Sequence, residues 1–323
     1  MTRLAIVVVS YNVCALLRGC LHALMCSTRA AGVDWDIWVI DNASADGSAA
    51  MVADEFPGVH CIASEHNLGF ARGNNTVLRQ LGFHDGPRTL AADTAPDLVL
   101  LLNPDTAVAP DAVTRMADFL LAEPTAGGCG AQLSYGDGQF QHGAFVFPGL
   151  WQLWFDFCPP PGRIRESRLN GRYPRAWYAA GQPFVVDFAL GAALMVRRAA
   201  IEAAGLLDEG YFMYCEEVDW CWRMRRAGWP LWCVPQARVT HFEGQSTRQF
   251  REQMVLALWR SRLRLYTQHY GPLRQWLARR MVRLGAELES VRVRRQARAG
   301  NLDANELAQR LGTYQRVAQL ARA

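Results

Sequence analysis

The tripeptide Asn103-Pro104-Asp105 follows directly after an apolar run and is the first group in this sequence that could do chemistry. Its amide and carboxylate oxygens, two positions apart, are the hard ligands that Mg²⁺ or Mn²⁺ prefers, and phosphate oxygens of a substrate normally complete such a site. Asn, Pro and Asp are also favoured turn residues, so the tripeptide alone leaves open an ordinary turn at the end of a strand.

Asp41 ends another apolar run and could bind a nucleotide. A carboxylate at a strand end can accept hydrogen bonds from a base or from ribose hydroxyls. An Asx turn or a helix cap formed with Ser44 and Asp46 is an equally good interpretation. No GxGxxG follows the first predicted strand and no GxxxxGK[ST] loop occurs, which disfavours a dinucleotide enzyme and a P-loop NTPase.

Glu216, Glu217 and Asp219 form an acidic cluster at the start of a predicted helix. Acids in a first turn suit the helix dipole, but this cluster exceeds what capping requires, and mutual repulsion is expected to raise the pKa of one member. A carboxylate tuned in this way can act as a general base toward a hydroxyl. Asp219 is expected on a different side of the helix, where Arg223 at i+4 can pair with it.

His241 ends the last predicted strand, in the stretch THFEGQST, and is followed by Gly244 and Ser246. A single histidine is more often structural than functional. Beside a metal-binding aspartate, however, an imidazole is a suitable additional ligand.

The hydrophobic pattern predicts the elements that must position these residues. Strands are expected in the stretches LAIVVVSYN (4–12), WDIWVIDNAS (35–44), VHCIASE (59–65) and DLVLLLNPD (97–105), with helical patterns between them. This alternation is typical of an α/β fold with a parallel sheet covered by helices, in which ligands bind at the carboxyl ends of the strands. Ser10, Asp41 and Asp105 all fall at such ends.

The rest of the chain is less regular. The segment 130–185 is rich in Gly, Pro and aromatic residues, and loops with a small antiparallel element are expected there. A strand followed by a helix is predicted over 184–209, a helix over 214–229, a strand over 230–242 and helices beyond 250. The nine cysteines are scattered without metal-ligand spacing and are expected to be free thiols.

Charge is divided unevenly along the chain. Residues 248–323 carry a formal net charge of +11 and residues 1–247 carry −7, and every basic residue is an arginine. Amphipathic helices rich in Arg, Leu, Trp and Met can bind an anionic membrane surface, pack on the body or contact another subunit. These alternatives stay open, a homo-oligomer among them. No recognised nucleic-acid motif accompanies the Arg run, so no nucleic-acid partner is expected.

The sequence also bears on location. No apolar run reaches the roughly 18–20 residues that cross a bilayer, and residues 1–10 do not resemble a signal peptide. A cytoplasmic protein is expected, with peripheral contact with the inner face of the cytoplasmic membrane as a further expectation.

Seven motifs occur in an order that resembles glycosyltransferase family 2, most of all its bacterial rhamnosyltransferase-like branch. They are VVVSYN, VIDNASADGS, NLGFARGNN, LLNPD, GAALMVRR, EEVDW and HFEGQS, and they lie within about residues 3–250. The resemblance implies a GT-A fold, Rossmann-like with a mainly parallel sheet flanked by helices, as the catalytic domain over 1–250. Residues 251–323 would form a helical, Arg-rich extension that contacts the membrane surface or a subunit.

The resemblance also implies a role for each matched residue. The nucleoside and diphosphate would lie near Ser10, Tyr11, Asn12, Asp41, Asn67, Gly69, Phe70, Arg72 and Asn103. Asp105 would be the main protein ligand of Mg²⁺ or Mn²⁺, with His241 contacting the metal or the diphosphate. The family's metal motif normally begins with Asp, and Asn103 in its place leaves strict metal dependence open.

The same match assigns the acceptor side. Glu217 takes the place of the catalytic base, with Glu216 as the alternative, and Asp187, Gly191 and Ala192 would face the acceptor. The implied reaction is inverting transfer of a sugar, best matched by L-rhamnose from dTDP-rhamnose, onto a hydroxyl of a cell-envelope polysaccharide or lipid-linked glycan. A UDP-hexose or another nucleotide-sugar donor is one alternative, and a catalytically silent membrane scaffold that binds a sugar nucleotide is another.

Overall fold

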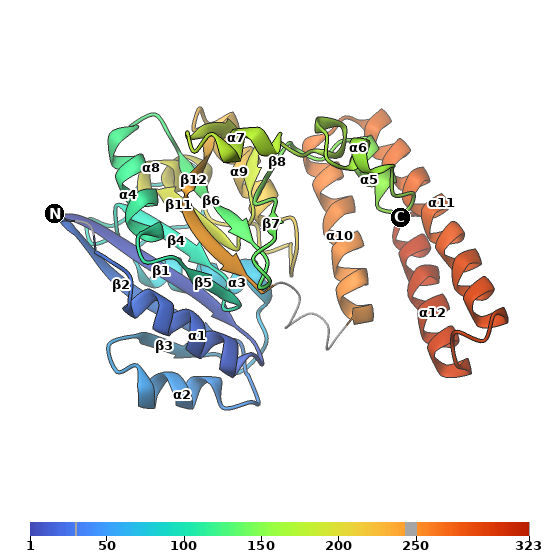
Figure 1. Cartoon of the computed structure of the whole chain (residues 1–323), viewed down its shortest axis with the longest axis horizontal. Coiled ribbons are helices and arrows are strands. Elements are labelled where there is room, and N and C mark those ends of the chain that lie inside the picture. The colour runs from blue at the N-terminus through green and yellow to red at the C-terminus, as the bar shows by residue number, and fades with distance from the viewer. Residues whose placement is uncertain (30, 243–250, 323) are drawn as a thin grey trace. The chain divides into compact units, whose positions relative to one another are not determined.

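The computed structural model describes residues 1–29, 31–242 and 251–322. Its elements form two compact units, and most of their helices and strands are labelled in Figure 1. The first unit contains Met1–Phe147, Tyr173–Phe212 and the segment from Glu216 to the end of β12, and the second contains Pro148–Arg172, Met213–Cys215 and the C-terminal helices. The boundary expected near residue 250 falls outside the described residues.

The first unit is built on a sheet of ten strands in the described residues, eight of them in the order β3-β2-β1-β4-β11-β6-β12-β5, with β7 paired to β6 and β9 to β12. The strands are β1 (Thr2–Ser10), β2 (Val33–Asp41), β3 (His60–Ala63), β4 (Leu98–Leu102), β5 (Thr106–Val108), β6 (Gly128–Ser134), β7 (Phe140–Gln141), β9 (Phe184–Val186), β11 (Ala193–Arg197) and β12 (Leu231–His241). A separate antiparallel pair consists of β8 (Ala144–Phe145) and β10 (Phe188–Ala189).

Most of this sheet is parallel, as the alternating pattern of strands and helices predicts. Strands β3, β2, β1, β4, β6 and β12 run in one direction, and β11 and β5 run against them. The carboxyl ends of the parallel strands therefore share one edge of the sheet. The pairing of β1 with β2 sets Ser10 opposite Asp41, and the pairing of β1 with β4 brings Leu102, the residue before Asn103, beside Val8.

Alternate side chains of the strands are buried on both faces of the sheet. Leu4, Ile6 and Val8 of β1 belong to a core shared with α1 (Cys14–Met25), α2 (Ser48–Glu55) and α4 (Ala112–Ala122). The next side chain, Val9, faces the other way and packs on α3 (Gly69–Gln80), where a Cβ added to Gly73 would lie 3.0 Å from Val9 Cγ1. This unit also contains α7 (Arg175–Ala179), α8 (Arg198–Ala204) and α9 (Glu216–Arg226).

Two expectations from the irregular middle of the chain are corrected. The segment 184–209, expected as one strand before a helix, divides into β9, β10 and β11 before α8. The chain breaks at Asp187, whose N–H donates to the Tyr173 hydroxyl at 3.0 Å, so each apolar piece pairs with a different strand. The segment 130–185 contains antiparallel pairs, as expected, and also short helices, which its weak periodicity did not indicate.

The second unit is helical. It consists of α5 (Leu150–Phe155), α6 (Gly162–Arg165), the 3₁₀ helix η1 (Arg168–Asn170), α10 (Arg251–His269), α11 (Pro272–Arg298) and α12 (Ala304–Leu320). In its core, the Phe157 and Trp259 rings stack with centroids 4.4 Å apart. Gly285 of α11 makes this close packing feasible, since a Cβ there would lie 2.2 Å from Phe157 Cγ. The helical C-terminal extension predicted from the sequence is therefore present, and none of the described helices is both long and apolar enough to span a membrane.

Candidate active site

The ends of β1 and β2 bring together the residues predicted to line a nucleoside pocket. Asp41 Oδ2 accepts a hydrogen bond from the Ser44 N–H at 2.9 Å, a local contact with Ser44 of the kind that the sequence left open. The other oxygen, Oδ1, and the neighbouring Ser10 Oγ are buried and have no hydrogen-bond partner in the described residues. Since a buried polar atom without a partner is costly, Asp41 can both hold the turn and present an acceptor to a ligand.

Asn12 ties the same two strand ends to each other. Its backbone lies in the left-handed region, with φ of 51°, and its Oδ1 accepts from the Ala45 N–H at 2.8 Å. Its own N–H donates to Ser44 Oγ at 2.9 Å. Tyr11, between Ser10 and Asn12, is half-buried at this edge. The SYN motif therefore does more than end β1, because its Asn12 also holds the loop that follows β2.

The end of β12 brings His241 to Asp105. Antiparallel pairing of β12 with β5 sets His241 opposite Thr106, the residue after Asp105. His241 Nε2 lies 3.4 Å from Asp105 Oδ1, and both side chains are buried. The other ring nitrogen, Nδ1, lies 3.2 Å from Oε1 of the buried Gln141. A glutamine oxygen can only accept, so Nδ1–H donates in this contact and Nε2 is the ring nitrogen that faces Asp105.

The Asp105–His241 pair is chemically suited to a divalent cation. A carboxylate oxygen and an imidazole nitrogen suit Mn²⁺, and Mg²⁺ is commonly held by one or two carboxylates together with substrate phosphates. In the part of the chain that the structure describes, no three His, Cys, Asp or Glu side chains come together as a metal-binding group. Residues 243–246 of the HFEGQS motif, with Gly244 and Ser246, lie outside the described residues.

The start of α3 is held against the segment before α9. Asn67 Oδ1 accepts from the Gly69 N–H at 2.9 Å, and the Phe70 N–H donates to the Phe212 carbonyl at 2.9 Å. Gly69 has a φ of +75°, and a Cβ there would lie 2.2 Å from the Phe212 oxygen. Glycine is thus required both by its conformation and by the close approach of backbone.

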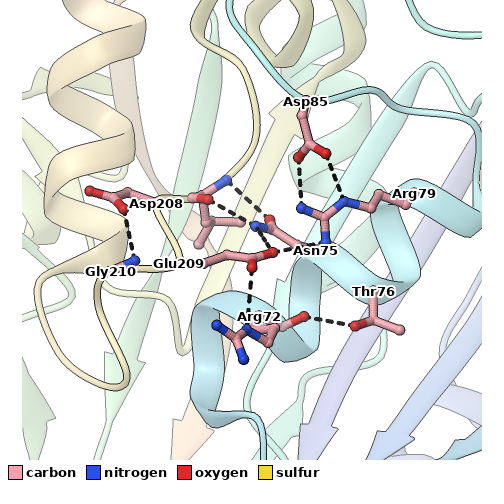
Figure 2. A network of polar contacts seen from close by, with 9 residues as sticks. Arg72, Asn75, Thr76, Arg79, Asp85, Asp208, Glu209 and Gly210 are labelled. Atoms are coloured by element: carbon pink, nitrogen blue, oxygen red, sulfur yellow. Dashed lines mark hydrogen bonds and ion pairs between the residues drawn. The ribbon is translucent and has the colours of Figure 1, made fainter.

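Arg72, on the next turn of α3, belongs to a charged network shown in Figure 2. Its Nε lies 3.2 Å from Glu209 Oε2, and Arg79 Nη1 and Asn75 Nδ2 contact Glu209 Oε1 at 2.8 and 3.1 Å. Arg79 also pairs with Asp85. Burial tends to raise the pKa of Glu209, but these hydrogen bonds and positive charges lower it overall, so Glu209 is an anion that fixes Arg72.

In this network Arg72 uses only its Nε toward Glu209, and Figure 2 shows its two terminal nitrogens pointing away from that carboxylate. The Arg72 side chain is about half exposed. A guanidinium held in this way presents two N–H-bearing nitrogens to a phosphate-sized anion.

Glu217 lies beside residues from two other predicted groups. A Cβ built on Gly191 would lie 3.2 Å from Phe70 Cζ and 3.8 Å from Glu217 Cβ. The first turn of α9, the start of α3 and the loop before β11 therefore meet at one point. Burial raises the pKa of Glu217 to about 7, whereas the sequence had suggested repulsion between neighbouring acids as the cause. A carboxyl with this pKa can exchange a proton near neutral pH.

The two neighbouring acids have different surroundings. Glu216 is buried at the start of α9. Asp219 pairs with Arg223 at 2.8 Å, which confirms the i+4 ion pair predicted from the sequence.

The residues predicted on the acceptor side fall into two places. The Ala192 carbonyl accepts from the Asn103 N–H at 3.1 Å, which joins the loop before β11 to the strand end that carries Asp105. Asp187 instead lies in a cluster with Arg225, whose guanidinium it pairs with, and with the Phe147 N–H, which donates to its Oδ2 at 2.9 Å. Both carboxylate oxygens of Asp187 are thus engaged by protein groups.

Gln141 and Glu209 are the residues of this site that sequence reasoning missed. Gln141 is in the irregular segment before β8, and its nearness to His241 depends on the pairing of β7 with β6 and of β6 with β12. Glu209 contacts α3 residues more than 130 positions earlier in the chain. Neither contact could be predicted from the sequence, because neither follows from the spacing of neighbouring residues.

Comparison with solved structures places this fold among the glycosyltransferases. The crystal structure of GalNAc-T7 with UDP, GalNAc and Mn²⁺ superposes with a TM-score of 0.56 at 15% identity, covering 83% of this chain and 48% of that one. The mannosyltransferase PcManGT from Pyrobaculum calidifontis, in complex with GDP-Man and Mn²⁺, gives 0.55 at 15% identity, covering 99% of this chain and 84% of that one. At such identities the likeness establishes the fold alone, and the protein has the GT-A fold.

Sequence comparison narrows the class to a family. The glycosyl transferase family 2 model matches residues 5–143. An N-acetylglucosaminyl-diphospho-decaprenol L-rhamnosyltransferase of Mycobacterium tuberculosis is 30% identical over 220 residues, which are 65% of this chain and 67% of the relative. Rhamnosyltransferase WbbL of Escherichia coli is 38% identical over 66 residues, 20% of this chain and 25% of that protein. This chain belongs to glycosyltransferase family 2 and is rhamnosyltransferase-like, as the seven motifs predict.

Proposed function

We propose that this glycosyltransferase is an inverting enzyme that moves L-rhamnose from dTDP-rhamnose to a hydroxyl of a lipid-linked or cell-envelope glycan. The observation that carries the proposal is the meeting of Glu217, Phe70 and Gly191 at the carboxyl edge of a GT-A sheet. The choice of rhamnose and of a lipid-linked acceptor is supported by the activity for which the Mycobacterium tuberculosis relative is named.

Glu217 is the proposed base. Because burial raises its pKa to about 7, the carboxylate binds a proton more tightly than an ordinary glutamate and still ionises at physiological pH. It would take the proton of the acceptor hydroxyl while the oxygen attacks the anomeric carbon from the face opposite to the diphosphate. A single displacement of this kind inverts the anomeric configuration.

The other side of the reaction is leaving-group stabilisation. Ser10, Tyr11, Asn12 and Asp41 would bind the nucleoside, with Asn67, Gly69, Phe70 and Asn103 beside the diphosphate. Arg72, oriented by Glu209, would offset the negative charge that develops on the leaving diphosphate. Asp105 and His241 would hold Mg²⁺ or Mn²⁺, which supplies further positive charge next to the diphosphate when bound.

The acceptor would approach from the side of Gly191 and Ala192. Asp187 would act there by holding Arg225 and the Phe147 backbone, because both of its carboxylate oxygens are already engaged. Because the proposed acceptor is lipid-linked, the protein would work in the cytoplasm at the inner face of the membrane, with residues 251–323 as its basic extension.

A thermal-shift panel tests the donor and the metal pair together. Sugar nucleotides of dTDP, UDP and GDP would be added to the protein with and without Mg²⁺ or Mn²⁺. Selective stabilisation by dTDP-rhamnose with the cation, lost in Asp105→Ala, is the expected result. Asp111→Ala is the matched control, because Asp111 is an exposed carboxylate paired with Arg115 and should leave the response unchanged.

Two outcomes would change the proposal. Preference for a UDP sugar would keep the fold and the base but replace the donor. An unchanged nucleotide response in Asp105→Ala would remove Asp105 from the cation site.

A further inference from the structure

Helix α11 has two opposite faces of different character. Its buried side chains are Ala278, Val282, Gly285, Ala286 and Val293. At about 100° per residue these positions cluster on one side of the helix. On the opposite side, large apolar side chains remain exposed to solvent: Leu273 at 71%, Trp276 at 53%, Leu284 at 49% and Val291 at 42%.

Arginines share this exposed side. Arg280, Arg294, Arg295 and Arg298 are exposed and fall within the same sector of about 120° as the four apolar residues. We define the outer face of α11 by these eight residues. The Arg280 guanidinium lies 5.1 Å from the centroid of the Trp276 ring. In the described parts of the chain, no carboxylate lies within ion-pair distance of any of these four arginines.

We propose that the outer face of α11 binds the surface of an anionic lipid bilayer. Leu and Trp side chains that are mixed with arginines suit the boundary between head groups and acyl chains. The arginine stems can cover apolar surface while the guanidinium groups reach lipid phosphates. Each arginine near such a surface strengthens binding by about fivefold.

A second copy of the chain is a poorer occupant of this face. Arg280 and Arg298 lie in line with Leu273, Leu284 and Val291, so a protein partner of the same kind would bury guanidinium groups with few carboxylates to receive them. Glu287 is the one acid of α11 that falls within this sector, and its carboxylate is already paired with Arg283 at 3.2 Å. A bilayer carries phosphates at the required depth and imposes no such cost.

Nucleic acid is also a poorer occupant. Phosphates could pair with the arginines, but exposed Leu and Val side chains have no favourable place along a duplex backbone. The proposal rests on the proposed function only for its purpose, which is to hold the enzyme where a lipid-linked acceptor lies. Vesicle binding itself requires no sugar nucleotide, so it can fail or succeed independently of sugar transfer.

Co-sedimentation of the full chain with vesicles tests the proposal. Vesicles of phosphatidylcholine alone would be compared with vesicles that contain about one-third phosphatidylglycerol. Binding to the anionic vesicles, weaker at high salt, is the expected result. Replacing Arg280, Arg294 and Arg298 together by Gln should weaken it at least tenfold, and Leu273→Ser with Trp276→Ser should weaken it without changing the charge.

Matched variants separate this face from overall charge. Replacing the exposed Arg29, Arg88 and Arg115 of the first unit by Gln removes the same charge elsewhere. Leu121→Ser removes an apolar side chain that is 47% exposed on α4. Both should leave vesicle binding within about twofold of wild type.

Three results would overturn the proposal. One is no binding to anionic vesicles. Another is equal loss of binding in the control with Arg29, Arg88 and Arg115 replaced. The third is a protein that forms a dimer, or binds duplex DNA, through Leu273 and Trp276 without binding vesicles, as light scattering and a DNA titration would show.

Discussion

Glu217 is the residue on which the proposed chemistry depends most. Replacing it with Gln keeps the size of the side chain and removes its ability to accept a proton. We expect kcat to fall by about 10²–10⁴-fold, with little change in donor KM, because proton abstraction is lost while donor binding remains. Steady-state kinetics of Glu217→Gln and Glu216→Gln would check this. Loss of transfer only in the Glu216 variant would move the base to Glu216.

The pKa of Glu217 also predicts how the stability of the fold depends on pH. Its folded pKa of about 7 lies above the ordinary value of 4.5, so the stability that this group contributes is present below pH 4.5 and is lost as pH rises through 7. Glu217→Gln should therefore be more stable than wild type at pH 8, by about 3 kcal/mol, and similar to it near pH 4.5. Denaturant unfolding at both pH values measures this. Equal stability at pH 8 would contradict the raised pKa.

Gln141 is predicted to set the tautomer of His241. Because its Oε1 requires a proton on Nδ1, Gln141→Leu should free the imidazole to change tautomer and should weaken Mn²⁺ binding by about 10–100-fold. Nitrogen NMR of His241 reports the tautomer, and titration calorimetry with Mn²⁺ and dTDP reports the affinity. Gln139→Leu, an exposed position two residues away, is the control. An unchanged His241 tautomer would remove Gln141 from this role.

Much of the candidate site could be predicted at the residue scale because the end of a buried strand is recognisable in the sequence as a polar residue after an apolar run. Ser10, Asp41 and Asp105 each follow a buried apolar run, and parallel strands collect their carboxyl ends at one edge. Gln141 and Glu209 could not be found in this way, since their partners lie about 100 or more positions away in the sequence.

At the scale of elements, α3 depends on the glycine at its first residue. Gly69→Ala must place a Cβ 2.2 Å from the Phe212 carbonyl oxygen at a φ of +75°, so we expect a loss of about 2–4 kcal/mol of stability and weaker nucleotide binding. Denaturant unfolding and dTDP binding would measure the two effects.

Gly19 provides the contrast for this prediction. It lies exposed within α1, where an added Cβ meets nothing within 4 Å. Gly19→Ala should therefore stabilise the protein by about 0.5–1 kcal/mol. Destabilisation by both alanines would show that the close approach of Phe212 is not the cause.

The elements themselves differ in how well the sequence predicts them. Strands β1 and β4 contain continuous apolar runs that are buried on both faces, β2 alternates buried and exposed residues before its buried end, and α1 and α4 show a clear apolar stripe. The segment 184–209 was harder to predict because its three short strands, β9, β10 and β11, pair with three different strands, β12, β8 and β4. Periodicity reports local exposure and says nothing about which strand a short apolar piece will join.

At the scale of the whole molecule, the uneven charge coincides with the division into two units. The basic C-terminal helices belong to the second unit, together with Pro148–Arg172, which sequence reasoning assigned to the catalytic domain. The place of Pro148–Arg172 in the second unit could not be predicted from the sequence, because it depends on contacts such as the stacking of Phe157 on Trp259, about 100 positions apart. Composition predicted the basic character of the helices, and tertiary packing determined their partners.

The most direct measurement is sugar transfer itself, with the full chain, dTDP-rhamnose, Mn²⁺ and a short-chain N-acetylglucosaminyl-diphospho-prenol acceptor. Mass spectrometry would detect the product, and NMR its anomeric configuration. We predict addition of one rhamnose, an anomeric configuration opposite to that of the donor, and loss of the product with Glu217→Gln. Retained configuration, or no transfer to any acceptor by a protein that still binds sugar nucleotides, would contradict an inverting rhamnosyltransferase.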